Sequence, residues 1–244
     1  CPEAGVATAR KLVSEDERAW GTDALGGPGD LLLMNKNAAF VVLGAESFNA
    51  WWVGGGIVVD AVAVDGCEQA GPERFGEVAW VLGRLDLSDF RGGSVLRGFL
   101  ADEVEVLADG SDGGAAIVRA TGHDQRFWLV EQTLIAETFD GGDVKPLSEP
   151  LGIAVIIDYA LHPGASALEI SITLRNTTDE HKGLLVGNIQ QFGEGMQTDV
   201  YAFEVLDIAG LHLDVGLPWV SASSGDAAWA LAIPGAMTGT FSVS

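Results

Sequence analysis

The strongest constraint on the fold of this chain is an alternation of apolar and polar residues over residues 168–175. Four apolar residues alternate there with four polar ones: Leu168, Ile170, Ile172 and Leu174 with Glu169, Ser171, Thr173 and Arg175. Successive side chains of a β-strand point to opposite faces, so a period of two places the apolar set in a core. The segment therefore predicts a strand with one covered face.

Neighbouring segments also read as strands joined by tight turns. Residues 31–34 and 38–43 are apolar and flank Asn35-Lys36-Asn37, which predicts a hairpin because Asn is favoured in such turns. Residues 152–161 are almost entirely apolar, as in a strand that is covered on both faces. The following His162-Pro163-Gly164-Ala165 predicts a turn into residues 168–175.

The middle of the chain repeats this arrangement. Residues 103–106 and 115–120 read as strands around the turn Asp109–Gly114, a second turn is expected at 122–125, and residues 126–139 read as a long strand. Consecutive strands with tight turns imply antiparallel pairing. We therefore expect an all-β fold, a large antiparallel β-sandwich of roughly twelve strands or more.

We expect two parts in the chain, a polar N-terminal tether or extension over residues 1–27 and a β-sandwich domain over residues 28–244. The last residues, 239–244, read as the start of a strand with no closing element. This pattern predicts a sandwich that is truncated at its C-terminal end and leaves an unpaired edge.

The charge balance excludes several classes of partner. Thirteen Lys and Arg face thirty-five Asp and Glu, a net charge of −22, which argues against binding nucleic acid or anionic membrane surfaces. An apolar content of 48% separates the chain from disordered acidic proteins. No apolar run approaches the roughly 20 residues that span a bilayer.

The N-terminal Cys1-Pro2-Glu3-Ala4 resembles the mature start of a bacterial lipoprotein. The resemblance implies lipidation of Cys1, an N-terminal lipid anchor and a location in the cell envelope or outside the cell. Two other interpretations stay open: a chain that simply begins at Cys, and a disulfide between Cys1 and Cys67.

The hairpin at residues 157–177 resembles the strand pair of galactose-mutarotase-like supersandwich domains. Residues 54–61, 74–77 and 109–114 add a similarity to the β-rich N-terminal region of myxobacterial cell-envelope proteins of the CehA/McbA metallohydrolase type. The similarity extends over about residues 28–200. It implies a supersandwich, without the His-rich metal domain that carries the chemistry of those hydrolases, and none of the four His here aligns with a mutarotase role.

Trp51 and Trp52, beside Asn49 and three glycines, form the most suggestive candidate binding site. Indole rings stack on sugar rings and an amide binds hydroxyls, which points to carbohydrate. The alternative is that one Trp closes the end of the sandwich while the glycines shape a loop.

Arg74 and Glu77, close to Glu73, are a second candidate ligand-binding loop, because an Arg can clamp a carboxylate. The alternative is an exposed loop held by salt bridges. Adjacent His123 and Asp124 are an acid–base candidate, against the alternative of solvated turn residues.

Asp109, Ser111 and Asp112 are a candidate Ca²⁺ site, since they bring carboxylate and hydroxyl oxygens onto one loop. The alternative is an ordinary β-turn, in which Asp and Gly are the usual residues. No other cofactor is expected.

We expect a non-catalytic β-sandwich module, secreted or anchored in the envelope, that binds carbohydrate or glycan. One alternative is the N-terminal accessory region of a metallohydrolase, or a mutarotase-like enzyme. The other is a structural surface protein that self-associates, which the acidity of the chain opposes unless salt or divalent cations screen it.

Overall fold

A computed structural model of the chain describes residues 5–19, 21, 23–47, 54–65, 68–84, 95–126, 150–180, 184–191, 197–200, 205–208, 211–214, 219–224, 227–232 and 240–243. Within these residues the chain is all-β, which confirms the predicted fold class. The described part contains no helix long and apolar enough to cross a membrane.

The strands follow one another along the chain with one short 3₁₀ turn near the start. They are β1 (Thr8–Lys11), the 3₁₀ turn (Glu15–Glu17), β2 (Leu31–Met34), β3 (Ala38–Val42), β4 (Val58–Asp65), β5 (Glu68–Gln69), β6 (Glu77–Arg84), β7 (Val95–Ala108), β8 (Ala116–Arg126), β9 (Ile153–Leu161), β10 (Leu168–Asn176), β11 (Leu185–Gln191), β12 (Gln197–Val200), β13 (Val205–Ile208), β14 (Leu211–Asp214), β15 (Trp219–Ser224), β16 (Ala227–Ala232) and β17 (Thr240–Val243).

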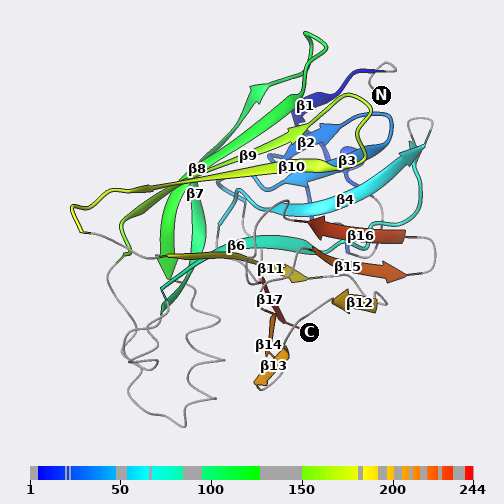
Figure 1. The fold of residues 1–244 in the computed structure, drawn as a ribbon. Coiled ribbons are helices and arrows are strands. Elements are labelled where there is room, and N and C mark those ends of the chain that lie inside the picture. Colours follow the sequence, from blue (N-terminus) through cyan, green and yellow to red (C-terminus); the bar gives the residue numbers. More distant parts are fainter. Residues whose placement is uncertain are drawn as a thin grey trace.

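Eleven strands form one antiparallel sheet in the order β1-β2-β3-β4-β6-β7-β8-β9-β10, with β11 beside β6 and β5 beside β4. Two three-stranded sheets, β12-β15-β16 and β13-β14-β17, complete the described strands. The large sheet curls, so that the long strands β7–β10 pass over β1–β4 (Figure 1). The amide of Ala9 in β1 donates to the carbonyl of Asp109 in the turn between β7 and β8 at 3.1 Å, which joins the first strand of the sheet to that turn across the curl.

The main core lies inside this curl. In β9 the residues alternate between fully and partly buried, and Ile153, Val155, Ile157, Tyr159 and Leu161 form one wall of the core. The apolar face of β10 packs against the same core, as its alternation predicts. The prediction that residues 152–161 are covered on both faces is wrong, because the second face of β9 is half-exposed. Asp158 lies on that face and pairs with Arg119 of β8 at 2.7 Å.

A second apolar cluster covers the opposite face of β2, β3, β4 and β6. Leu12 packs into this cluster at 1% exposure, and Ala19 packs against it. The expected tether over residues 1–27 therefore contains part of the domain, since β1 pairs with β2 and Leu12 closes a core. Apolar side chains such as Leu12 fix the segment by burial, although its charged cluster made it look like a tether.

Three of the four predicted turns are confirmed and one is wrong. The hairpin of residues 31–43 and the turns at 109–114 and 162–165 are confirmed by the pairings of β2 with β3, β7 with β8, and β9 with β10. The turn expected at 122–125 is wrong, because these residues continue β8 opposite β7. Residues 127–139 of the predicted long strand lie outside the described residues.

The final strand is also paired. β17 lies antiparallel to β14, with Thr240 opposite Asp214. β17 therefore pairs with residues 211–214 on one side and is the last strand in the order β13-β14-β17.

Candidate functional site

Trp51, Trp52 and Asn49 lie outside the described residues, as do Cys1 and Cys67. The glycine turn that follows the Trp pair is described and is fixed tightly to the core. A Cβ on Gly55 would lie 1.9 Å from the carbonyl oxygen of Gly44, so only glycine fits there. The carbonyl of Gly56 accepts a hydrogen bond from the Tyr159 hydroxyl at 2.7 Å. The segment after the Trp pair is thus held in one place.

The loop of residues 73–77 is largely buried, unlike the exposed loop that we considered as an alternative. Glu73 is 0% exposed and Glu77 is 1% exposed, while Arg74 is half-buried. Glu73 Oε1 accepts a hydrogen bond from the amide of Phe75 at 2.7 Å, and its Oε2 has no hydrogen-bond partner among the described residues. Of the two candidate ligand-binding residues, Glu77 is therefore buried and Arg74 is partly accessible.

Burial controls the protonation of this loop. Burial, with a smaller contribution from the neighbouring Asp60, raises the pKa of Glu73 to about 8. Burial also raises the pKa of Asp60, whose oxygens accept hydrogen bonds from the amides of Leu25 and Gly26 at 2.8 and 2.9 Å. The Asp60 carboxyl group thus holds the segment after the 3₁₀ turn against β4, whereas that of Glu73 accepts from the amide of Phe75 in its own loop, and both tasks are structural.

In the candidate Ca²⁺ loop the carboxylates accept hydrogen bonds from backbone amides of the same loop. Asp109 accepts from the amide of Ser111 at 2.9 Å, which lowers the pKa of Asp109, and Asp112 accepts from the amide of Gly114 at 2.8 Å. Gly110 and Gly113 have φ values of 79° and 82°, which suit glycine in a turn. In the described part of the chain no three His, Cys, Asp or Glu side chains gather as metal ligands would.

The adjacent His123 and Asp124 do not form an acid–base pair. His123 Nδ1 lies 2.9 Å from the carboxylate of exposed Asp102, whereas Asp124 is buried and pairs with Arg97 at 2.5 Å. Adjacent residues of a strand face opposite sides, so the two side chains diverge. The prediction fails for that reason.

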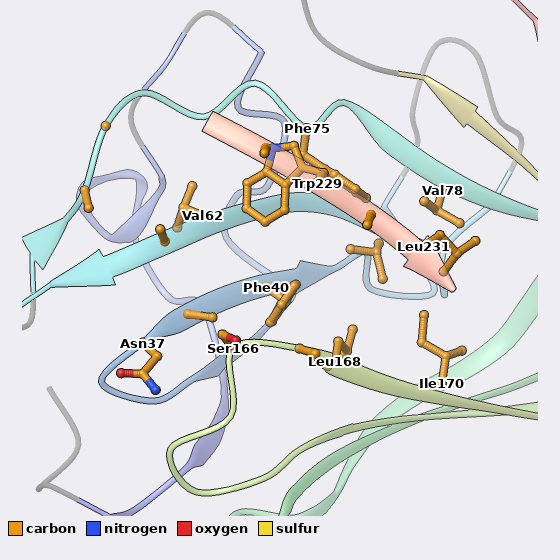
Figure 2. Close-up of a pocket in the computed structure, with 18 of the residues that line it drawn as sticks. Asn37, Phe40, Val62, Phe75, Val78, Ser166, Leu168, Ile170, Trp229 and Leu231 are labelled. Atoms are coloured by element: carbon orange, nitrogen blue, oxygen red, sulfur yellow. The ribbon is translucent and has the colours of Figure 1, made fainter. Parts of the chain in front are cut away.

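The best-formed concave site is one that the sequence did not indicate. A pocket of about 500 Å³ lies between β3, β4, the loop of residues 70–75, the start of β10 and β16. Its deep side is the main core, where Phe40, Val58 and Val78 are buried (Figure 2). Its size falls within the range of small-molecule sites, about 300–1,000 Å³.

An aromatic pair forms one wall of this pocket. The rings of Phe75 and Trp229 meet edge to face, with centroids 5.6 Å apart and planes at 72°. In β16, Trp229 and Leu231 are more buried than the exposed Ala228 and Ala230 on either side of Trp229, as the alternation of a strand requires. The aromatic wall therefore comes from segments more than a hundred residues apart.

Small side chains leave the entrance open. Ala63, Ala70, Ser166 and Ala167 line the pocket and are exposed. Asn37 lies at the same end as Ser166 (Figure 2), and its side-chain amide donates to the carbonyl of Gly164. None of the described residues that line the pocket carries a charge at pH 7. The arrangement suits non-covalent binding.

Sequence reasoning missed this site because its signal is spread over distant segments. An alternating Ala-Trp-Ala-Leu run at residues 228–231 predicts a strand with two large residues on one face, but not what lies opposite. Comparisons with family models, with curated proteins and with solved structures found no significant match to this chain.

Proposed function

We propose that this chain is a non-catalytic binding module that takes a small molecule into the pocket between β3, β4, β10 and β16. The observation that carries the proposal is the pocket itself, with its volume of about 500 Å³ and an aromatic wall of Phe75 and Trp229. Large, mostly apolar pockets with a few polar groups are the usual form of a small-molecule site.

The chemistry of the lining favours binding over catalysis. General acid–base and nucleophilic catalysis need a positioned His, carboxylate, Lys or Cys, or a hydroxyl beside a base. The described lining offers only the Ser166 hydroxyl, with no His, carboxylate or Lys among the lining residues to act as its base. A ligand can be held in such a site, but the lining provides no group to move a proton.

Carbohydrate binding through Trp51, Trp52 and Asn49 is the second candidate. The observation that favours it is the fixed glycine turn that follows these residues, since Gly56 is hydrogen-bonded to Tyr159. This turn anchors the chain directly after the segment that carries the candidate residues. A glycan array with the Trp51→Ala and Trp52→Ala variants tests this candidate, and equal signals from wild type and variants would contradict it.

The pocket proposal is tested by blocking the entrance. Ala63→Trp and Ala167→Trp each place a large side chain on an exposed rim position, where the fold tolerates it. Leu107→Trp, at another exposed position outside the pocket, is the matched control. A library of small molecules is screened by thermal shift, because a ligand that binds the folded state raises its melting temperature.

We expect compounds that stabilise the wild type and Leu107→Trp but not the two rim variants. Compounds that stabilise all four proteins equally would show that the pocket is not the site. The absence of any stabilising compound would contradict the proposal as a whole.

A further inference from the structure

We infer that the ligand of this pocket is an uncharged molecule with a long apolar body and one polar end, such as an alcohol or an ester, held with its polar end at Ser166. The inference rests on the proposed function and specifies its ligand class.

The pocket is polar at one end and apolar at the other. Figure 2 shows Asn37 and Ser166 together at one end, while Val78, Ile170 and Leu231 lie at the opposite end. The Asn37 side-chain amide already donates a hydrogen bond to the Gly164 carbonyl. The exposed Ser166 hydroxyl is therefore the polar group at that end which can rotate to meet a ligand. A hydroxyl both donates and accepts, so it suits an alcohol or an ester oxygen.

The depth of the pocket argues for an elongated apolar body. The lining continues from exposed Ser166 and Ala167 through half-buried Leu168 and Ile170. Phe40 and Val78 also line the pocket and are only 7% and 4% exposed. A ligand that enters at Ser166 therefore places its apolar part against the main core, where burial of apolar surface stabilises the complex.

The charge pattern argues against an ionised ligand. The described lining contains no cationic side chain that could pair with a carboxylate or a phosphate, and a buried charge without a partner is strongly unfavourable. The net charge of −22 adds long-range repulsion of anions at low ionic strength. A free fatty acid is thus disfavoured, although its apolar chain fits.

The test compares probes that share one chain and differ only in the head group. Decanol, methyl decanoate, decanoate and decyltrimethylammonium are titrated into the wild-type chain below their micelle concentrations, with binding followed by calorimetry. We expect decanol and methyl decanoate to bind at least about tenfold more tightly than decanoate at pH 7, a difference of about 1.4 kcal/mol. The ammonium probe should bind more weakly than the two neutral probes.

A variant with a cation at the polar end tests whether the missing positive charge sets the preference for uncharged ligands. Ser166→Lys places a cation at the polar end on an exposed position, so the affinity for decanoate should rise by about tenfold or more while that for methyl decanoate falls or stays equal. Leu107→Lys makes the same change in net charge at a distant exposed residue and should leave the preference unchanged.

The outcomes separate the two proposals. If none of the four probes binds, the inference is overturned, while the library screen of the wild type and the rim variants still decides the proposed function. If the probes bind but Ala167→Trp leaves their binding intact, the pocket is not their site, which overturns the inference and contradicts the proposed function. If the probes bind and Ala167→Trp abolishes binding, but decanoate or the ammonium binds as tightly as decanol, the pocket stands and the uncharged ligand is overturned.

Discussion

The indole of Trp80 in β6 and the hydroxyl of Tyr159 in β9 are joined by a hydrogen bond of 2.7 Å inside the main core. The same hydroxyl donates to the carbonyl of Gly56 at 2.7 Å, so one oxygen connects two strands and the glycine turn. Tyr159 is completely buried, and burial raises its pKa. The phenol therefore stays neutral and can donate its hydrogen bond to the Gly56 carbonyl.

Removing this hydroxyl should destabilise the protein. Tyr159→Phe leaves the Trp80 N–H and the Gly56 carbonyl without their partner in a buried place, and we expect the free energy of unfolding to fall by about 1–3 kcal/mol. Urea unfolding measures the change. A double-mutant cycle with Trp80→Phe should show that the two losses are not additive, and additive losses would contradict the coupling.

The buried ion pair of Arg97 and Asp124 should be the most sensitive polar contact in the described sheet. Their side chains are 3% and 1% exposed, and Asp124 also accepts from the amides of Leu151 and Ile153 at 2.7 and 3.1 Å. Asp124→Ala leaves a buried guanidinium without its counter-charge, and we expect a loss of about 3–5 kcal/mol in urea unfolding.

The exposed pair provides the control for that experiment. Arg119 and Asp158 make a bidentate contact on the outer face, where they are 33% and 30% exposed. Asp158→Ala should cost about 1 kcal/mol or less, since water screens the pair. Equal losses at the two positions would show that burial does not set the cost.

Glu73 should make stability depend on pH. Its pKa is about 8 in the folded protein against 4.5 for an exposed Glu, so the folded state keeps a proton that the unfolded state releases. Stability contributed by the neutral form is therefore complete below about pH 4.5 and is lost as pH rises toward 8. Glu73→Gln, which is always neutral, should reduce this loss.

The measurement is the free energy of unfolding of wild type and Glu73→Gln between about pH 4 and pH 9, a range that includes both the ordinary Glu pKa of 4.5 and the pKa of about 8 in the folded protein. The difference in favour of the variant should grow with pH. Glu17→Gln is the control, because Glu17 is partly buried and the hydrogen bond from the Val13 amide lowers its pKa, so its pH dependence has the opposite sign. A constant difference for Glu73→Gln would contradict the prediction.

Asn35 should connect the two turns beside the pocket. Its Oδ1 accepts from the amides of Asn37 and Ala38 at 2.8 and 3.0 Å, and its Nδ2 donates to the carbonyls of His162 and Ala165 at 2.9 and 2.8 Å. Asn35→Asp keeps the acceptor but turns a charge toward two carbonyls.

We expect Asn35→Asp to lower the free energy of unfolding by about 2 kcal/mol or more. The variant buries a carboxylate, and the carbonyls of His162 and Ala165 lose the N–H donor that they accept from in the wild type. Asn37→Asp at the neighbouring turn position, where the side chain is more exposed, should cost less. Thermal unfolding of the two variants measures both losses of stability. A loss for Asn37→Asp equal to or larger than that for Asn35→Asp would show that the hydrogen bonds of Asn35 do not stabilise the two turns.

The strands of this protein were largely predictable from local patterns. The alternation at residues 168–175 and the apolar runs around Asn35 determine strands and turns that the structure contains, because side-chain period and turn chemistry act over a few residues. The acidity is likewise a property of composition alone. The Asn35 turn also shows the limit, since its side chain reaches carbonyls 127 and 130 residues away.

The pocket and the buried charges were decided by tertiary structure. Asp124 looked like a turn residue, yet the pairing of β7 with β8 buries it against Arg97. Phe75 and Trp229 meet only because β16 lies over the loop before β6. Local sequence determines which way a side chain points from its own strand, whereas the partner it meets depends on how the curled sheet brings distant strands together, and that is set by the burial of the whole core.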